Sequence, residues 1–403
     1  MIFKARFRTG SDTEYQLLST HLEEAGMYAE LFAKKIGLSK PALLTALVHD
    51  LGKFSSIWQK YLEKSHKEGR KGKPEDHSTA GGQYLYEAIK EKFGDAGELI
   101  GQFLAACVIY HHGSGLPDVI GLDGTPRLYN RLLKDREKTH IDEAAANLDP
   151  TIKQKIDALL SDPNFISETA ETLNRLMDAP VKDAMDTPVK NARYFNLGLS
   201  VRALSSCLID GDRRSSALDD REISVRLEEA AAQADWTALL KRLEDHLAGL
   251  PAEGKINEIR RKVSERCAAF AEQGDGVYTL TAATGAGKTL ASLRYALTLA
   301  ERASKDHIAE RAGKDHIFII APYTSILDQN ADIIRGILDP AGENGEIVLE
   351  HHSNLEKGEQ TEHFADSSET WNTPVIITTM VQFLETLFGS GTRKIRRMHQ
   401  LAN

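Results

Sequence analysis

The sequence predicts a mainly α-helical bundle followed by an α/β lobe with a parallel sheet. From Tyr15 to about Asp220, apolar residues recur at three- and four-residue spacing, which is typical of amphipathic helices. After Asn257 the pattern changes to short apolar runs, and helical stretches separate most of them. Strands that alternate with helices indicate a parallel sheet.

Five segments of the helical region carry histidine or aspartate. They are YQLLSTHLEEAGMYAELFAKKI (15–36), ALLTALVHDLGKF (42–54), HSTAGGQYLYEAI (77–89), GQFLAACVIYHH (101–112) and FNLGLSVRALSSCLIDGD (195–212). We expect His49 and Asp50 to lie inside an apolar helix. An unpaired carboxylate is costly there, so it is normally paired or bound to a metal.

The second region contains four apolar runs that we expect to be buried strands. They are VYTLTA (277–282), HIFIIAP (316–322), GEIVLE (345–350) and PVIITT (374–379). Helices are expected between them, at LASLRYALTLAERA (290–303) and SILDQNADIIRGIL (325–338). The changes in pattern predict a helical domain at 1–222, a charged helical connector at 223–250 and the α/β lobe at 251–403.

The composition is that of an ordinary globular protein. Three cysteines without CxxC spacing suggest a reducing compartment and argue against a zinc knuckle or a disulfide framework. No apolar run approaches the length of a membrane span, and the first ten residues lack the apolar centre of a signal peptide. The net charge of −9 argues against a surface that coats nucleic acid, but not against a local basic groove. We therefore expect a cytoplasmic protein with no membrane partner.

The strongest single motif is AATGAGKT (282–289), which lies between a predicted strand and a predicted helix, as a phosphate-binding loop requires. The backbone N–H groups that would cradle the phosphates belong to Thr284, Gly285, Ala286 and Gly287. Lys288 would reach the β- and γ-phosphates, and the Thr289 hydroxyl would hold Mg²⁺. Ala282 stands where the usual pattern has glycine, so the motif differs from it by one methyl group.

Further polar residues flank this motif. Asn257 and Arg260 lie one helical turn apart upstream, a spacing suited to reading an adenine edge, although a solvated helix face explains them equally well. Two loops downstream follow predicted strands, at the carboxyl edge where parallel α/β proteins bind ligands. Their side chains are expected either to grip a nucleic-acid backbone or to cap helices: Thr324, Ser325, Gln329, Thr378, Thr379 and Gln382.

The histidines and aspartates of the helical region suit a metal site, because a bundle can project ligands from separate helices to one point. The candidates are His21, His49, Asp50, His77, His111, His112 and one aspartate of LIDGD. Asp212 continues the apolar face of Leu204 and Leu208, so we prefer it to Asp210. Imidazole favours Fe, Mn, Ni, Co or Zn, and a bridging carboxylate suits a two-metal site that cleaves a phosphodiester. Taken singly, each histidine has an ordinary alternative, such as a contact with a helix C-terminus.

These motifs resemble the CRISPR-associated nuclease-helicases of type I systems, in which an HD-domain bundle precedes a RecA-like lobe of a superfamily 2 helicase. The matching stretches follow the family's order along nearly the whole chain: VHDLGKF, HSTAGG, YHHGSG, LIDGDR, INEIR, TAATGAGKT, APYTSILDQN, EHHSNL and ITTMVQFLETLF. The most diagnostic are PYTSILDQ and TTMVQFLETLF, because many other NTPases share the phosphate loop.

The resemblance implies a single-stranded DNA endonuclease and exonuclease in the HD domain, and an ATP-driven translocase that moves 3′ to 5′. The implied cofactors are two divalent transition-metal ions (Fe, Mn, Ni or Co) and ATP with Mg²⁺. By motif position, Lys53 would lie close to the scissile phosphate, beside His49 and Asp50. The implied partners are single-stranded DNA, a Cascade-type surveillance complex at an R-loop and a phage anti-CRISPR inhibitor.

One departure from the family pattern concerns the motor. No hydrophobic strand ending in Asp-Glu follows TTMVQFLETLF, and this acidic pair holds Mg²⁺ and positions the attacking water in this class of motor. The second helicase lobe is also missing from the sequence. We therefore expect the amino-terminal portion of a longer protein, which retains nuclease activity without unwinding duplex DNA.

Two other functions stay open at this point. One is an HD phosphohydrolase that acts on nucleotides, with the α/β lobe as a regulatory nucleotide sensor. The other is a non-catalytic fragment that docks on the surveillance complex or on an inhibitor. Such phosphohydrolases often use a single metal and fewer histidines, so the doublet of His111 and His112 favours the nuclease.

Overall fold

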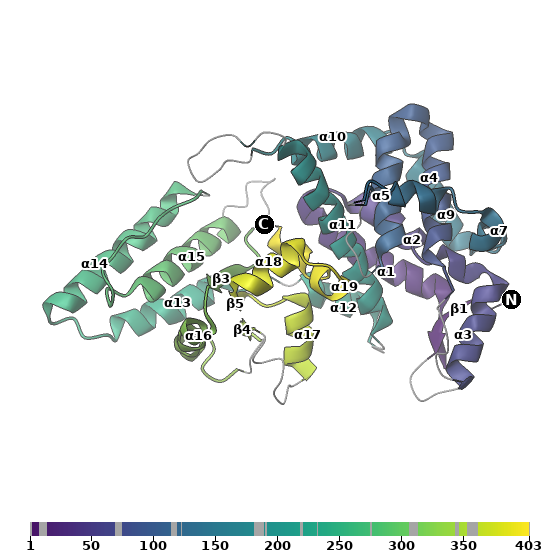
Figure 1. Ribbon diagram of the computed structural model, residues 1–403. Helices are drawn as coiled ribbons and strands as arrows, with labels where there is room; N and C mark the ends of the chain where they lie inside the picture. The colour runs from purple at the N-terminus through teal and green to yellow at the C-terminus, as the bar shows by residue number, and fades with distance from the viewer. Residues whose placement is uncertain are drawn as a thin grey trace. The chain divides into compact units, whose positions relative to one another are not determined.

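The computed structural model describes residues 2–7, 14–68, 75–113, 119–121, 123–180, 189, 192–217, 221–231, 233–274, 276–305, 313–342, 346–352 and 362–402. The chain divides into two compact units. The helical unit comprises Met1–Ala231 and Thr386–Ala402, and the α/β unit comprises Ala232–Glu385 with Asn403. Figure 1 shows that helices make up most of both units, which confirms a mainly helical chain with a small parallel sheet.

The helical unit begins with a two-stranded hairpin, β1 (Lys4–Phe7) and β2 (Tyr15–Leu17). Its longer helices are α1 (Leu18–Ala33), α2 (Ser39–Val48), α3 (Ser56–Glu68), α4 (Ser78–Phe93), α5 (Glu98–Tyr110), α9 (Pro150–Ser161), α10 (Phe165–Met177) and α11 (Ala192–Ser216). Shorter helices are α6 (Arg127–Leu132), α7 (Arg136–Thr139), α8 (Ile141–Ala146), α12 (Ile223–Ala231) and α19 (Thr392–Ile395).

Helices α1, α2, α4, α5 and α11 surround the main core of this unit. Leu18 and Leu22 of α1 and Leu204 and Leu208 of α11 are completely buried. Each pair is spaced by one helical turn, so both residues lie on one face. Burying a leucine side chain contributes roughly 1.5–3 kcal/mol, so this stripe fixes which face of each helix points inward.

The first helix begins later than the apolar pattern predicts. Tyr15–Leu17 is a strand, and it pairs antiparallel with β1, with Arg6 opposite Gln16. The Nε of Arg6 also donates to Oε1 of Gln16 at 3.1 Å. This pairing holds the segment extended, so the expected helix starts at Leu18 instead of Tyr15.

The expectation that His49 and Asp50 lie inside a helix is wrong. Helix α2 ends at Val48, and a short 3₁₀ turn, η2 (Leu51–Phe54), follows Asp50. The N–H of Gly52 donates to the carbonyl of His77 at 3.2 Å, so the chain turns here to meet the start of α4. The pair therefore lies at a junction between two elements, where side chains can point in directions that one regular helix does not allow.

The α/β unit contains a sheet of three parallel strands, in the order β3 (Ile317–Ala321), β5 (Val375–Thr379) and β4 (Val348–His351). Its helices are α13 (Trp236–Ala248), α14 (Lys255–Phe270), α15 (Lys288–Lys305), α16 (Thr324–Leu338), α17 (Glu362–Thr370) and the first part of α18 (Met380–Phe388). The predicted parallel arrangement is confirmed. Residues 223–250, predicted as a connector, contain α12 in the helical unit and α13 in the core of the α/β unit.

Of the four predicted strands in this unit, the one at 277–282 is wrong. These residues pair with none of the described strands, and Val277 is fully exposed. Apolar composition alone predicted the strand, but a strand needs a hydrogen-bonding partner. Instead, the ring of Tyr278 contacts those of Phe270 and Tyr295, with centroids 5.0 and 6.1 Å apart. The other three runs form strands, although residue 345 lies outside the described residues.

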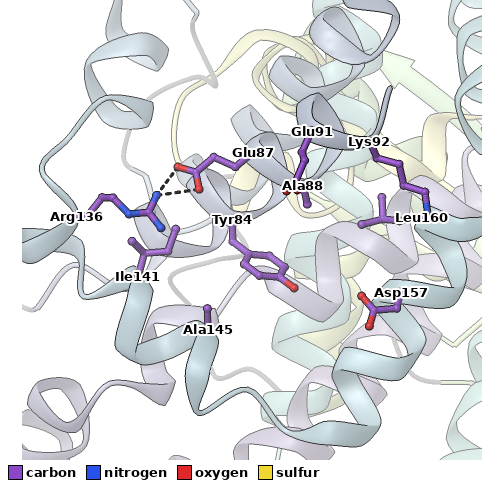
Figure 2. Close-up of a pocket in the computed structure, with 10 residues that line it drawn as sticks. All are labelled: Tyr84, Glu87, Ala88, Glu91, Lys92, Arg136, Ile141, Ala145, Asp157 and Leu160. Atoms are coloured by element: carbon purple, nitrogen blue, oxygen red, sulfur yellow. Dashed lines mark hydrogen bonds and ion pairs between the residues drawn. The ribbon is translucent and has the colours of Figure 1, made fainter. Parts of the chain in front are cut away.

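Two further features are plain. Over the part of the chain that the structure describes, no helix is long and apolar enough to cross a membrane. A surface pocket of about 560 Å³ opens in the helical unit, where Arg136 pairs with Glu87 at 2.6 Å (Figure 2). None of the residues that line it belongs to the predicted metal or nucleotide sites.

Candidate metal centre and nucleotide-binding loop

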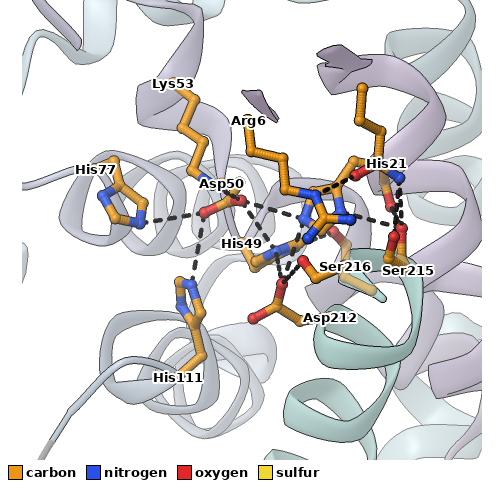
Figure 3. Close-up of polar contacts among 12 residues, drawn as sticks. Arg6, His21, His49, Asp50, Lys53, His77, His111, Asp212, Ser215 and Ser216 are labelled. Atoms are coloured by element: carbon orange, nitrogen blue, oxygen red, sulfur yellow. Dashed lines mark hydrogen bonds and ion pairs between the residues drawn. The ribbon is translucent and has the colours of Figure 1, made fainter. Parts of the chain in front are cut away.

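The carboxylate of Asp50 lies at the centre of the predicted metal ligands. It is completely buried, and histidines from four segments surround it (Figure 3). Its two oxygens face different partners, so the ligands form two groups that share this one residue. Asp50 therefore has the position that a bridging carboxylate needs.

The first group combines Asp50 with His21 of α1, His49 at the end of α2, and Asp212 of α11. Oδ2 of Asp50 lies 3.3 Å from Nε2 of His21 and 3.4 Å from Nε2 of His49. Oδ1 of Asp212 lies 3.4 and 3.8 Å from the same two nitrogens. One ligand atom from each of the four residues lies within 4.8 Å of the others, so a single ion can reach all of them.

The second group combines Asp50 with His77, at the start of α4, and with His111 and His112, which follow α5. Oδ1 of Asp50 lies 3.2 Å from Nε2 of His77 and 3.6 Å from Nε2 of His111. His112 is exposed, whereas His111 is buried. The second group is therefore the side of the cluster that meets the surface.

The other ring nitrogen of each inner histidine is held by a hydrogen bond. Nδ1 of His49 and Nδ1 of His111 lie 2.7 and 2.6 Å from the carbonyls of Ala46 and Val108. Nδ1 of His21 lies 3.0 Å from Oγ of Ser215. Metal-binding histidines usually have such a second partner, which fixes the ring and turns Nε2 toward the ion.

The Nε2 atoms that face Asp50 are buried, and within the described residues none of them makes a hydrogen bond. They belong to His21, His49, His77 and His111. Their polar neighbours are the carboxylates of Asp50 and Asp212, at 3.2–3.8 Å, so four imidazole nitrogens converge on two carboxylates. Two divalent cations fit this donor set, because imidazole nitrogens and carboxylate oxygens together suit transition metals.

The ionisation of the buried groups follows from their neighbours. Burial raises the pKa of Asp50, but the charges of Lys53 and His49 outweigh it and hold that pKa well below its usual range. Burial also opposes the charge on His49, yet the carboxylates of Asp50 and Asp212 raise its pKa to about 10. Burial lowers the pKa of His111. Burial also raises the pKa of Asp212, but His21 and His49 outweigh it and hold that pKa well below its usual range. Both carboxylates are thus ionised, as metal ligands must be, whereas His49 would lose its proton on binding an ion.

Lys53 completes the surroundings of Asp50. Its Nζ lies 2.6 Å from Oδ2 of Asp50 and 4.9 Å from the centre of the Trp58 ring. The ring restricts where the ammonium group can go, because a cation is attracted to an aromatic face. Lys53 therefore holds a positive charge at the edge of the cluster.

The two aspartates of LIDGD have different surroundings. Asp212 lies with the histidines of the first group, whereas Asp210 pairs with Arg214, Arg396 and His399. The two side chains are two residues apart on one helix, so they point to different sides of it.

Two residues near this site were missed at the sequence level. A Cβ at Gly52 would lie 2.4 Å from the carbonyl oxygen of His77, so only glycine allows this close approach. Ser215 contacts His21 and lies one turn beyond Asp212 on α11. The glycine of HDLGK was a usable signal, but nothing in the sequence around Ser215 indicated its role.

The predicted phosphate loop lies in the α/β unit, directly before α15. Gly285 and Gly287 both have φ of 79°, which other residues rarely adopt. Nζ of Lys288 donates to the carbonyls of Ala282 and Ala283, at 2.7 and 3.1 Å. These bonds hold the ammonium group against the backbone of the loop whose phosphates it is predicted to bind.

Neighbouring helices support this loop. Nε of Arg260 donates to the carbonyl of Gly285 at 2.9 Å, and NH1 of Arg260 donates to Oδ1 of Asn257 at 3.3 Å. The hydroxyl of Thr289 lies 3.3 Å from Oδ1 of Asn330 on α16. Asn257 and Arg260 are thus brought to the loop, and Asn330 is a neighbour that sequence analysis missed.

The residues predicted to grip nucleic acid differ in accessibility. Ser325 and Gln329 are exposed, and Thr324 is partly buried. Thr378 is completely buried, and its hydroxyl donates to the carbonyl of His351 at 2.8 Å. Thr379 accepts a bond from the N–H of Gln382, as a helix cap does. Residues 324–329 are therefore better placed than Thr378 to contact a nucleic acid.

Comparison with known proteins gives matches of three kinds: to a family model, to a curated protein and to solved structures. The family model "Type III restriction enzyme, res subunit" (ResIII) matches residues 253–396. The CRISPR-associated nuclease/helicase Cas3 of Haloferax volcanii is 28% identical over 181 residues, which covers 38% of this chain and 19% of that protein. The crystal structure of T. fusca Cas3 matches 100% of this chain and 45% of its own, with a TM-score of 0.55 and 18% identity.

The ATP form of T. fusca Cas3 gives a similar result, with a TM-score of 0.56, 16% identity and coverage of 99% of this chain and 46% of that one. At these identities the solved structures support the fold. The chain spans about a fifth of the curated relative and just under half of the solved ones. Together the matches confirm the resemblance to the CRISPR-associated nuclease-helicases and support an enzyme with a helicase-family domain.

Proposed function

From this Cas3-like resemblance we propose that the helical unit is an HD-type nuclease that cuts single-stranded DNA with two metal ions. We propose that the α/β unit is the first RecA-like lobe of an ATP-dependent 3′ to 5′ helicase acting in type I CRISPR interference. The observation that carries the nuclease is Asp50, whose two oxygens each face a separate group of histidines.

In the proposed mechanism one ion would be held by His21, His49 and Asp212, a second by His77, His111 and His112, and Asp50 would be shared by both. When bound, two ions of Fe, Mn, Ni or Co would supply an activated water and charge stabilisation for a phosphodiester displacement. The backbone carbonyls at Nδ1 of His49 and His111 keep those rings oriented. Lys53 presents its ammonium group beside Asp50, where it can attract the scissile phosphate.

In the α/β unit, we propose that Lys288 leaves the carbonyls of Ala282 and Ala283 to bind the β- and γ-phosphates of ATP. Thr289 would hold Mg²⁺, while Asn257 and Arg260 support the loop and meet the adenine. The proposed partners are single-stranded DNA and a Cascade-type surveillance complex. The predicted phage inhibitor stays a prediction without a contact surface.

The test is to incubate the 403-residue chain and Mn²⁺ or Ni²⁺ with circular single-stranded DNA, and in parallel with deoxynucleotides. We expect nicking of the circle that disappears in Asp50→Ala and persists in His246→Ala, a control at an exposed histidine of α13. Release of phosphate from nucleotides without DNA cutting would favour the phosphohydrolase instead. Inactivity in both assays, with well-folded protein and bound metal, would favour a docking fragment.

A further inference from the structure

Residues 386–402, called here the anchor segment, pack on α11 within the helical unit. NH2 of Arg202 donates to the carbonyl of Gly389 at 3.0 Å. The hydroxyl of Ser206 donates to the carbonyl of Arg396 at 2.8 Å and accepts from the N–H of His399 at 2.9 Å. These bonds tie the anchor segment to the helix that carries Asp212.

The anchor segment also reaches the carboxylate of Asp210. Nε of Arg396 lies 2.6 Å from Oδ1, and Nε2 of His399 lies 3.1 Å from Oδ2. Arg214, from α11 itself, lies 3.0 Å from the same Oδ2. Asp210 is completely buried, and Arg396 and His399 are more than nine-tenths buried. His399 also stacks on the ring of Phe32 of α1, with centroids 4.5 Å apart.

A buried ionic cluster of this kind is a weak source of stability, because desolvation of the charges offsets their attraction. Its better-attested effect is to fix one geometry, since each charge has a single place where it is compensated. Arg396 stands 186 positions after Asp210 in the chain, so the cluster defines a specific long-range contact. Any displacement of the anchor segment would leave Asp210 without two of the three charged partners that it has among the described residues.

The backbone of α11 connects this cluster to the metal site over three residues. Asp210 faces the anchor segment, and Asp212 faces His21 and His49. Between them, a Cβ at Gly211 would lie only 2.6 Å from the carbonyl oxygen of Ala25, so α11 touches the backbone of α1 here. With that contact as a fixed point, a rotation of the helix at Asp210 moves Asp212 as well.

We infer that Asp210 is a positioning residue that, through Arg396 and His399, sets the place of Asp212 in the metal centre. The inference rests on the proposed nuclease function and adds a dependence on the anchor segment. That segment follows α18, whose preceding strand β5 ends at the predicted nucleic-acid loop. By this inference, the metal centre depends on the segment that begins at the end of ITTMVQFLETLF, one of the stretches that resemble the helicase family.

The experiment uses the full chain and compares Asp210→Asn and Arg396→Gln with Arg193→Ala. Arg193 lies on the same helix and pairs with Asp178 at the surface, at 3.2 Å, so its removal controls for loss of any arginine contact on α11. The measurements are Mn²⁺ affinity by titration, the visible absorption spectrum of bound Co²⁺, and amide hydrogen exchange over residues 204–216.

We expect Asp210→Asn and Arg396→Gln to weaken Mn²⁺ binding by about tenfold, the lower end of the range for partners that bond a ligand directly, because they act on Asp212 through the helix. The Co²⁺ spectrum should change, exchange over 204–216 should quicken, and Arg396→Lys should recover part of the affinity. If both variants match Arg193→Ala in affinity and spectrum, the inference is overturned, even if their melting temperatures fall. If the wild-type chain takes up no metal, the proposed function itself is overturned, and exchange over 204–216 still reports whether the anchor holds α11.

Discussion

The metal cluster and the phosphate loop differ in how complete they are. In the cluster, Asp50 and His49 are fully buried, and their ring and carboxylate atoms already face one another. In the loop, Lys288 is exposed and bonds to backbone carbonyls of its own loop. The residues before the loop are not in the sheet. One site is prearranged by a packed core, whereas the other has its motif in place but must rearrange to bind a nucleotide.

This difference shows that a recognisable sequence motif does not by itself mean that the binding site is already formed. The loop motif is easy to recognise in sequence, because its residues are consecutive. The cluster is difficult to recognise, because its members come from five segments and each has an ordinary alternative. Because α1, α2, α4, α5 and α11 pack together, the metal cluster is better formed than the phosphate loop.

The largest expected effect is at the shared ligand. Asp50→Ala removes the group that faces both sets of histidines, so both ions should be lost. We expect cleavage of single-stranded DNA to fall by at least ~10²–10³-fold, the range seen when a main electrostatic stabiliser is removed. Initial rates with Mn²⁺ measure this, with His246→Ala as the control. Near-wild-type cleavage by Asp50→Ala would show that Asp50 is not the ligand that both groups need.

The next effect concerns the phosphate loop. Lys288→Ala removes a charged contact to phosphate, which is worth about 1.5–3 kcal/mol, so ATP affinity should fall roughly 10- to 100-fold. Equilibrium binding of a fluorescent ATP analogue measures this. Lys241→Ala, at an exposed lysine of α13, is the matched control. Equal affinities in the two variants would mean that Lys288 stays on its carbonyls and does not contact the phosphates.

Gly52→Ala tests how tightly the second group is packed. The added Cβ would overlap the backbone of His77, and we expect a loss of about 1–3 kcal/mol in the free energy of unfolding. Urea unfolding measures it, together with Mn²⁺ binding at the side of His77. Gly198→Ala on α11 is the control, because nothing lies within 4 Å of its Cβ position. Equal stabilities of the two variants would contradict the close approach at Gly52.

Ser215→Ala is the smallest change. It removes the hydroxyl at Nδ1 of His21, so that ring is less well oriented. We expect Mn²⁺ affinity of the first group to fall by about tenfold, with the fold unchanged in circular dichroism. Ser167→Ala, at an exposed serine of α10, is the matched control. An affinity equal to that of the control would mean that the hydroxyl does not orient His21.

Much of the fold could be predicted from the sequence, because helical periodicity is a local property. The helices of the first region follow from it, and three of the four predicted strands follow from short apolar runs, which are local as well. The strand at 277–282 could not be judged in this way, since pairing depends on a distant partner. The hairpin of Lys4–Phe7 with Tyr15–Leu17 was missed for a different reason, because its strands are short and partly polar.

The candidate site shows the same limit. The histidine types and the phase of Asp212 on its helix were visible in the sequence, and the structure brings these residues together. The turn after Asp50 was not visible, because it depends on a bond between Gly52 and His77. Neither was the attachment of Arg396 and His399 to Asp210, since charge patterns do not indicate contacts nearly 200 residues apart.

Counting the Mn²⁺ ions bound per chain at saturation tests most directly whether Asp50 is shared by two ions. We expect two ions in the wild-type chain, one in the variant His77→Ala with His111→Ala and His112→Ala, and none held tightly in Asp50→Ala. A single ion in the wild type, or two ions retained in Asp50→Ala, would contradict this expectation.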